Sequence, residues 1–297
     1  MTLLLSLVGE QPIPILLTHR ALNPQRHLLV FTDKTKRVAD QLHNLLPNSE
    51  LRPIPDAYNL AEIARRFRQE TADNLVFNLT GGTKPMAWAG YEVALQKQAD
   101  FVYLQSEGKK SVLYRFSFQD GRLVQKAEQL PRLITLEDYL QAHGLETVPS
   151  KPPSNPQEAA IYRFLHKHCD QCLHNLQYPA FEIDFFVQRS NQAAVIEAKS
   201  GLGKVTRKRQ AIDQLTTITG REYLGTYTGR IWINAKEPGS QLKELADAYQ
   251  IKIVVVQLEQ HAGSWRLTQK SQDALAQALD TVLGEREPSI RLIPEYR

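Results

Sequence analysis

The chain has 297 residues, of which 42% are hydrophobic and 23% are charged, as in globular proteins of roughly two domains. Its formal net charge of +4 excludes a strongly basic arm but permits a nucleic-acid partner. Two cysteines argue against a disulfide framework, and no apolar run approaches the roughly 18 to 20 residues of a membrane span. We therefore expect a cytoplasmic protein with no membrane association, whose start, MTLLLSLVGEQ, is a first strand rather than a leader.

Apolar runs alternate with helical patterns through the first half of the chain. This alternation favours a mostly parallel sheet with crossover helices, in a Rossmann-like arrangement. The strands are predicted at 3–8, 28–32, 75–79 and 101–105, and the helices near 34–46, 59–72 and 86–98.

A connector follows. The stretch HGLETVPSKPPSNPQ (143–157) has four prolines among polar residues, which is typical of a link between domains. A boundary is therefore predicted near residue 150. Beyond it, the pattern predicts a second α/β domain, with helices at 157–170, 205–219, 240–249 and 271–283 and strands at 181–188, 193–198, 229–234 and 251–257.

The loop NLTGGTKPM (78–86) lies between a predicted buried strand and a predicted helix. Two glycines, two threonine hydroxyls and a lysine at such a turn indicate an anion, because free backbone N–H groups there point at a negative ligand. The spacing is not that of a nucleotide triphosphate loop, since Lys84 is followed by Pro85. Thr83 is expected to cap the following helix. A plain tight turn with a solvated lysine remains the alternative.

Two other loops are expected at the same edge of the sheet. The segments VGEQP (8–12) and TDKT (32–35) follow the first and second predicted strands. In a parallel α/β sheet, ligands bind beyond the carboxyl ends of the strands. The three loops are therefore predicted to line one cleft.

The second half carries a set of charged residues that suits phosphodiester chemistry. Asp184 lies in one predicted strand, and Glu197-Ala-Lys199 lies in the next. The spacing puts Glu197 and Lys199 on one face of a strand. Carboxylates are hard ligands for Mg²⁺ or Mn²⁺, and a lysine can orient the attacking water and offset phosphate charge. Glu158, at the start of the preceding helix, could project into the same site.

Each of these residues also has a structural interpretation. Asp184 and Glu197 could be edge-strand carboxylates that form surface ion pairs with Lys199. Glu158 could simply complement the dipole of its helix.

The loop NLTGGTKPM, followed by a C-terminal Asp…Glu-Ala-Lys, resembles the CRISPR-associated Rossmann-fold (CARF) effector nucleases of type III CRISPR antiviral defence. In that family, a cyclic-oligoadenylate sensor is fused to a PD-(D/E)xK restriction-endonuclease-like domain. The resemblance implies a CARF domain at 1–142, a linker at 143–156 and an α/β nuclease domain at 157–297. One residue departs from the motif, because Ile183 stands where its name has proline.

The resemblance also implies roles for individual residues. The activator would be a cyclic oligoadenylate, with cyclic tetra-adenylate the expected ring, bound across the two-fold axis of a homodimer. Its binding would allosterically activate a Mg²⁺- or Mn²⁺-dependent nuclease that cleaves DNA, RNA or both. The implied ligand-binding residues are Gly9, Gln11, Pro12, Thr32, Asp33, Thr80, Gly81, Gly82, Thr83, Lys84 and Met86. The implied catalytic residues are Asp184, Glu197, Lys199 and Glu158, with Asp184, Glu197 and Glu158 as metal ligands.

Three alternatives stay open from the sequence. RFLHKH (163–168) has the Arg-x4-His spacing of the helical HEPN ribonucleases, with Arg163 and His168 as catalytic residues. HKHCDQCLH offers Cys169 and Cys172 with nearby histidines as part of a zinc site. The chain could also be a nucleotide-sensing regulatory module whose nuclease domain is degenerate.

Overall fold

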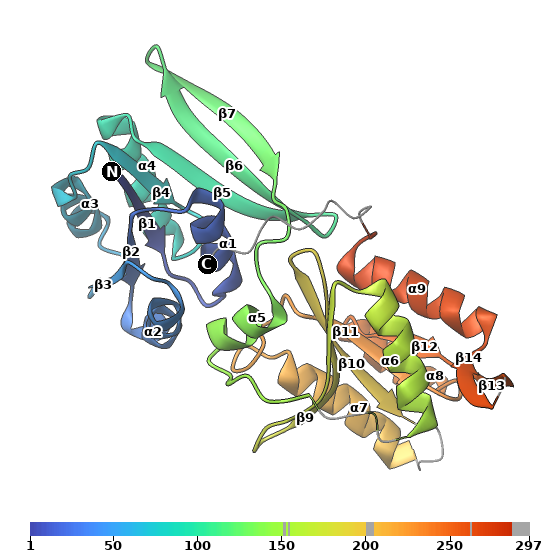
Figure 1. Ribbon diagram of the computed structural model, residues 1–297. Coiled ribbons are helices and arrows are strands. Elements are labelled where there is room, and N and C mark those ends of the chain that lie inside the picture. The colour runs from blue at the N-terminus through green and yellow to red at the C-terminus, as the bar shows by residue number, and fades with distance from the viewer. Residues whose placement is uncertain (151–152, 154, 200–204, 262, 287–297) are drawn as a thin grey trace. The chain divides into compact units, whose positions relative to one another are not determined.

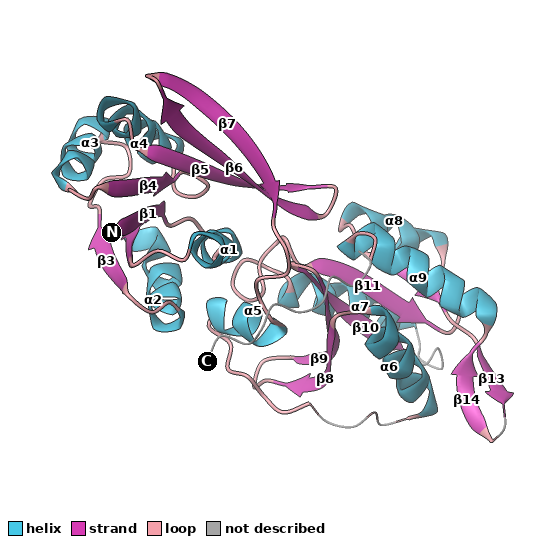
Figure 2. Ribbon diagram, turned by 45° about the horizontal axis from the view of Figure 1, so that its top comes forward, coloured by secondary structure: helices cyan, strands magenta, loops and turns pink. Residues whose placement is uncertain are grey.

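The computed structural model describes the chain except residues 151–152, 154, 200–204, 262 and 287–297 (Figure 1). The chain is divided into two compact units. The first comprises Met1–Val148 together with Ile218–Tyr227, and the second comprises Pro149–Thr217 together with Thr228–Arg297. Each unit has its own sheet, and in both units helices accompany the strands (Figure 2).

The first unit is built on a seven-stranded sheet with the order β3-β2-β1-β4-β5-β6-β7. The neighbouring strands β3, β2, β1, β4 and β5 pair in parallel, whereas β5, β6 and β7 pair antiparallel. The strands are β1 (Thr2–Leu7), β2 (Arg26–Phe31), β3 (Ser49–Pro53), β4 (Asn74–Asn78), β5 (Asp100–Glu107), β6 (Lys110–Gln119) and β7 (Arg122–Gln129). The near-continuous apolar runs of β1, β2 and β4 are those of strands buried on both faces.

Five α-helices and one 3₁₀ helix accompany this sheet in the described residues. They are α1 (Ile13–Leu22), η1 (Asp33–Thr35), α2 (Lys36–Leu45), α3 (Leu60–Gln69), α4 (Lys84–Lys97) and α5 (Leu136–Ala142). Side chains of α3 and α4, such as Phe67 and Val93, share one core with Leu5 and Phe77 of the sheet. Side-chain caps from Asn59, Thr83 and Thr135 begin α3, α4 and α5, because each satisfies a backbone N–H that the first turn leaves unpaired.

The sequence pattern missed several elements of this unit. Every residue of β7 is exposed, so the strand has no apolar alternation to detect. The sequence pattern did not predict helix α1, in which Pro12 lies at the N-cap and Pro14 in the first turn, where proline is tolerated. Strand β3 is short and largely polar. The sheet was predicted to be mostly parallel, but β5, β6 and β7 form an antiparallel edge.

The second unit has a five-stranded mixed sheet with the order β12-β11-β10-β9-β8. Strands β8, β9 and β10 pair antiparallel, and β10, β11 and β12 pair in parallel. The strands are β8 (Gln171–Gln177), β9 (Glu182–Arg189), β10 (Gln192–Lys199), β11 (Gly229–Asn234) and β12 (Lys252–Val255), with a separate hairpin of β13 (Leu258–His261) and β14 (Ser264–Leu267). The sequence pattern did not predict β8, β13 or β14.

Four helices accompany the second sheet in the described residues: α6 (Pro156–His168), α7 (Val205–Ile218), α8 (Ser240–Ala248) and α9 (Gln269–Leu283). Ile161 of α6 and Leu279 of α9 share a core with Phe185, Ile196 and Ile231 of the sheet. Residues that alternate with these along β9, β10 and β11 therefore lie on the opposite face.

Among the described helices, none is both long enough and apolar enough to cross a membrane.

Candidate functional sites

The glycine loop after β4 packs against the end of β1. A Cβ on Gly81 would lie 2.2 Å from the carbonyl oxygen of Leu7 and 3.0 Å from the backbone nitrogen of Gly9, so a side chain there has no room. Gly82 has a φ of +73°, a conformation that side chains rarely adopt. The structure therefore brings the loops after β1 and β4 together through glycine backbones.

The loop after β2 joins the same edge. The backbone N–H of Val8 donates to the carbonyl of Val30 at 2.8 Å, which ties the end of β1 to the end of β2. Thr32 and Asp33 follow β2, with Thr32 as the N-cap of η1 and Asp33 exposed. All three predicted loops thus lie at the carboxyl ends of neighbouring parallel strands.

The side chains of the glycine loop have different environments. Lys84 and the Gly82 backbone are exposed, whereas Met86 is 1% exposed and belongs to the core beneath the loop. The Thr83 hydroxyl donates to the carbonyl of Ala57 at 3.0 Å and accepts from the backbone of Met86 at 3.4 Å. The exposed groups able to meet an anion are therefore Lys84 and the loop backbone, at the N-terminus of α4.

A buried row of polar side chains leads to this loop, and sequence reasoning did not single it out. The backbone N–H of Leu104 donates to the Thr80 hydroxyl at 2.8 Å, and that hydroxyl lies 2.6 Å from Asn78 Oδ1. Asn78 Nδ2 donates to Ser6 Oγ at 3.2 Å. Thr80 is therefore anchored inside the protein by its hydroxyl, and its backbone N–H also donates to Asn78.

The row continues through two histidines. His27 Nε2 lies 2.7 Å from Ser6 Oγ, and His27 Nδ1 lies 2.9 Å from His19 Nδ1. Burial, and next the Arg20 charge, lower the pKa of His19 to about 4, and burial holds the pKa of His27 well below its usual value. The available signals were Ser6 inside the apolar run LLLSLV and His27 directly before the apolar run LLVF.

In the second unit, Asp184 and Glu197 lie across from each other on neighbouring strands. The antiparallel register pairs Phe185 with Ile196, so the next pair along the ladder is Asp184 and Glu197. The backbone N–H of Ala198 donates to Asp184 Oδ2 at 2.7 Å. Lys199 forms an ion pair with Glu197, as the two-residue spacing predicts. Asp184, Glu197 and Lys199 therefore form one cluster.

The cluster concentrates negative charge in a buried place. Glu197 is 0% exposed. Burial raises the pKa of Asp184 to about 6, and burial together with the Asp184 charge raises the pKa of Glu197 to about 8. Two buried carboxylates side by side are unfavourable unless a cation compensates them. Lys199 supplies one positive charge, and the two carboxylates are suited to a second cation.

Glu158 lies near this cluster, although its carboxylate is held by its own helix cap. Asn155 Nδ2 donates to Glu158 Oε1 at 2.6 Å, and the Glu158 backbone donates to Asn155 Oδ1 at 2.9 Å. Its charge contributes to the raised pKa of Asp184. Sequence reasoning missed Glu182, whose charge also raises the pKa of Asp184 and of Glu197. The available signal was its position two residues before Asp184, which places both side chains on the same face of the strand.

The carboxylates of this cluster match the needs of a divalent cation only in part. Among the described residues, no three His, Cys, Asp or Glu side chains converge closely enough to hold a metal. Mg²⁺ is often bound by one or two carboxylates, with water and substrate oxygens as its other ligands. Asp184 and Glu197 fit this pattern, whereas the carboxylate of Glu158 accepts a hydrogen bond from Asn155.

The two alternative sites receive no support from the described residues. Arg163 donates to the carbonyl of Trp265, and the His168 ring stacks on Phe164 with centroids 4.1 Å apart. The sheet around them excludes an all-helical HEPN fold. Cys169 is buried, and burial raises its pKa to about 11, which disfavours the thiolate that zinc requires.

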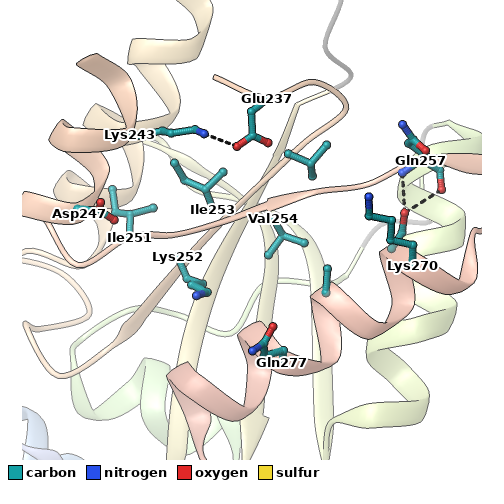
Figure 3. A pocket seen from close by; sticks show the side chains of 13 residues that line it. Glu237, Lys243, Asp247, Ile251, Lys252, Ile253, Val254, Gln257, Lys270 and Gln277 are labelled. Carbon is teal, nitrogen blue, oxygen red and sulfur yellow. Dashed lines mark hydrogen bonds and ion pairs between the residues drawn. The ribbon is translucent and has the colours of Figure 1, made fainter. Parts of the chain in front are cut away.

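A separate hollow of about 520 Å³ lies beside the edge strand β12, next to α8 and α9 (Figure 3). Lys243 and Glu237 form an ion pair at 2.5 Å in it, and Val254 and Gln277 also line it. None of the clustered acids lines this hollow.

Comparisons with known proteins agree with this architecture. Residues 3–139 match the family model of the Card1 CARF domain. No curated protein matches the chain.

Solved structures resemble the chain over most of its length. Can2 from Sulfobacillus thermosulfidooxidans, in complex with cyclic tetra-adenylate, has a TM-score of 0.72 and 15% identity, covering 95% of this chain and 99% of that one. Protein VC1899 from Vibrio cholerae has a TM-score of 0.72 and 11% identity, covering 96% and 99%. A type III CRISPR defence DNA nuclease activated by cyclic oligoadenylate has a TM-score of 0.63 and 17% identity, covering 92% of this chain and 51% of that one.

At these identities the likeness concerns the fold. The predicted fold class is confirmed: the chain has an N-terminal Rossmann-like CARF domain followed by a second α/β sheet domain.

Proposed function

We propose that the chain is a nuclease of type III CRISPR defence, activated by a cyclic oligoadenylate and dependent on a divalent metal. The observation that carries the proposal is the buried pair of Asp184 and Glu197, with Lys199 paired to Glu197. Sensing is supported by the match to the Card1 CARF domain and by a similarly folded protein that was solved with cyclic tetra-adenylate.

The ligand-binding face is proposed at the loops after β1, β2 and β4. A cyclic oligoadenylate presents a ring of phosphates, so it requires cationic and N–H groups that face it. Lys84 and the backbone around Gly81 and Gly82 provide both at the start of α4. Cyclic tetra-adenylate is the ring that we expect, because a similarly folded protein was solved with it and because its symmetry is compatible with a two-fold pair of such loops.

A homodimer is proposed through α4. Trp88, Tyr91 and Leu95 are 60%, 42% and 39% exposed, and the spacing of three, then four, residues gathers them on one face of the helix. This face begins four residues after Lys84. A second copy packed on it would bury the aromatic side chains and bring two glycine loops together.

The chemistry is proposed to use Asp184 and Glu197 as ligands of Mg²⁺ or Mn²⁺. A metal bound there would act as a Lewis acid on the phosphate group. Asp184 is oriented by the Ala198 N–H. With the Glu197 charge compensated by a metal, the Lys199 ammonium would be available to orient the attacking water and offset phosphate charge. Glu158 and Glu182 are proposed to add to the negative potential rather than to bind the metal directly.

The proposal is tested with single-stranded and duplex DNA and RNA, in Mg²⁺ or Mn²⁺, against a panel of cyclic oligoadenylates. Cleavage that requires both metal and one ring size is the expected result. If the ring binds but no substrate is cut, the chain is instead a nucleotide-sensing module with a degenerate nuclease domain. If cleavage is equal with and without every ring, the activating role of the first unit is wrong.

A further inference from the structure

Strand β11 gives each residue of the Glu-x-Lys motif a neighbour of complementary hydrogen-bonding character. The parallel register places Glu197 beside Trp232 and Lys199 beside Asn234. Ile196, Ile231 and Ile233 share the core on the opposite face. Trp232 and Asn234 therefore lie on the same face of the sheet as Glu197 and Lys199.

The first pair joins a donor to an acceptor. Trp232 is 0% exposed, and its Nε1–H has no hydrogen-bond partner among the described residues. Apart from the ion pair with Lys199, the carboxylate of Glu197 likewise has no hydrogen-bond partner in the described part of the chain. A buried indole N–H normally finds an acceptor, and Glu197 is the acceptor that the register places beside it.

The second pair has the opposite polarity. Asn234 is 0% exposed, and its Nδ2 donates to the carbonyl of Lys236 at 2.6 Å. This bond fixes the orientation of the amide, since only the nitrogen can donate. The Oδ1 atom is buried and has no hydrogen-bond partner within the described ranges. The residue that the register places beside Lys199 thus carries an unused acceptor.

We propose that Trp232 and Asn234 are positioning residues that hold Glu197 and Lys199 in their working arrangement. When a metal is held at the site, Trp232 would donate to the Glu197 carboxylate and fix its orientation. Asn234 would accept from the Lys199 ammonium when that ammonium is released from its ion pair with Glu197. This inference rests on the proposed nuclease function.

The burial of both side chains favours this role over plain packing. A core that needs only volume at these positions is served by apolar residues, as at Ile231 and Ile233 on the other face. Burying an indole N–H and an amide oxygen without partners is unfavourable. If the Trp232 N–H and the Asn234 amide oxygen complete their hydrogen bonds when a metal occupies the site, their position beside the two motif residues is explained.

The test uses Trp232→Phe, which removes the N–H and keeps an aromatic ring, and Asn234→Ala. Ile233→Val is the matched control, because Ile233 lies between them and faces the opposite core. Mn²⁺ affinity is measured by calorimetry, and kcat and KM are measured at saturating cyclic tetra-adenylate. Thermal unfolding verifies that each variant is folded.

Trp232→Phe is expected to weaken Mn²⁺ binding by roughly 10-fold, in the range found for partners of metal-ligating groups. Asn234→Ala is expected to lower kcat at saturating Mn²⁺, with KM and Mn²⁺ affinity unchanged. The control should retain all three values. As a measurement on the unmodified chain, the indole N–H resonance that is lost in Trp232→Phe should shift when Mg²⁺ is added.

The outcomes separate the inference from the function on which it rests. If the unmodified chain cleaves nothing, the proposed function is wrong. If it cleaves while both variants keep its Mn²⁺ affinity and kcat, Trp232 and Asn234 only pack, and the inference is overturned. An indole resonance of Trp232 that does not move with Mg²⁺ overturns its role. If Trp232→Phe does not fold, this resonance is identified as the one that remains when the exposed Trp88 and Trp265 are each replaced by Phe.

Discussion

Gly225 lies so close to Gln11 that a Cβ on the glycine would be 2.3 Å from the Gln11 side-chain oxygen. Gln11 follows β1 in a loop predicted to contact the ligand. Gly225 belongs to Ile218–Tyr227, which is part of the first unit but connects α7 to β11 of the second. Arg221 in the same segment forms an ion pair with Glu10, with 3.0 Å between Arg221 Nη1 and Glu10 Oε1. A shift of the ligand loop would therefore act directly on a segment that is covalently joined to the proposed nuclease domain.

This relationship predicts that Gly225→Ala uncouples sensing from cleavage. The added methyl group would displace Gln11, and a φ of +78° would strain the alanine. Stimulation of cleavage by cyclic tetra-adenylate should fall by about 5-fold or more, the lower end of typical coupling strengths. Ligand-independent cleavage should not change.

Gly121→Ala is the control for this experiment. Gly121 has a φ of +73° but no atom within 4 Å of its would-be Cβ, so it introduces similar strain without a clash. Equal stimulation in the two variants would rule out a role for the Gly225–Gln11 contact.

The carboxylate cluster predicts a clear separation of functions. Glu197→Gln should abolish metal-dependent cleavage, since it removes the charge of one of two metal ligands. Lys199→Ala should lower kcat by about 100-fold even in excess metal, as for other groups that stabilise charge in the transition state. Calorimetry should find cyclic tetra-adenylate bound by both variants as tightly as by the parent chain. Full rescue of Lys199→Ala by added metal would contradict the role of the lysine at the water and phosphate.

Much of this cluster could be predicted from the sequence, because the contacts involved are local. Glu197 and Lys199 share a face through a two-residue period, and Asp184 reaches them through one hairpin. Trp232 and Asn234 could not be predicted in the same way. Their places depend on the parallel register of β11 against β10, which a helix-containing crossover separates in sequence.

The first unit shows the same limit. The glycine loop was recognisable because Gly81 and Gly82 meet a backbone requirement that glycine alone satisfies. The contact of Gly225 with Gln11 joins residues more than 200 positions apart, and no local pattern encodes it. Strand β7 is exposed along its whole length, so its pairing with β6, rather than burial, decides that it is a strand.

The glycine loop predicts the effect of two substitutions on ligand affinity. Lys84→Ala should weaken cyclic tetra-adenylate binding by about 10-fold, because a hydrogen bond to a charged group contributes about 1.5 kcal/mol or more. The salt dependence of binding should decrease with it. Gly82→Val should bind still more weakly, since its φ is +73° and its Cβ would lie 2.9 Å from Leu7.

Lys97→Ala, at the other end of α4, is the matched control and should bind normally. Titrations at two salt concentrations distinguish the variants. An unchanged affinity for Lys84→Ala would remove this loop from the ligand site.

The buried histidine pair predicts a loss of stability in acid. The pKa of His19 is lowered from 6.5 to about 4 in the folded chain, so between these values the unfolded chain binds the proton more readily. Stability from this group is therefore fully present above about pH 6.5 and is lost as the pH falls toward 4. The free energy of unfolding of the first unit can be measured by urea titration at several pH values. In this range it should fall by up to about 1.4 kcal/mol for each pH unit of acidification and each such histidine.

His19→Gln should flatten this dependence, because glutamine does not titrate there. His27, whose pKa is held well below its usual value, and His143, whose pKa is lowered to about 4, would still contribute to the remaining slope. A slope that is identical in the variant and the parent chain would contradict the neutral state of His19.

The exposed face of α4 predicts that dimerisation and ligand binding are lost together. Trp88→Glu would place a charge on the face formed with Tyr91 and Leu95, where a second copy must exclude water. Light scattering should then report a monomer. Because the proposed ring is held by two copies of the glycine loop, its affinity should fall in the same variant. Tyr249→Glu replaces a similarly exposed aromatic residue in α8's C-cap and should leave the dimer intact. A monomeric Trp88→Glu variant that binds cyclic tetra-adenylate at full affinity would mean that one glycine loop suffices, and that the two-fold site is wrong.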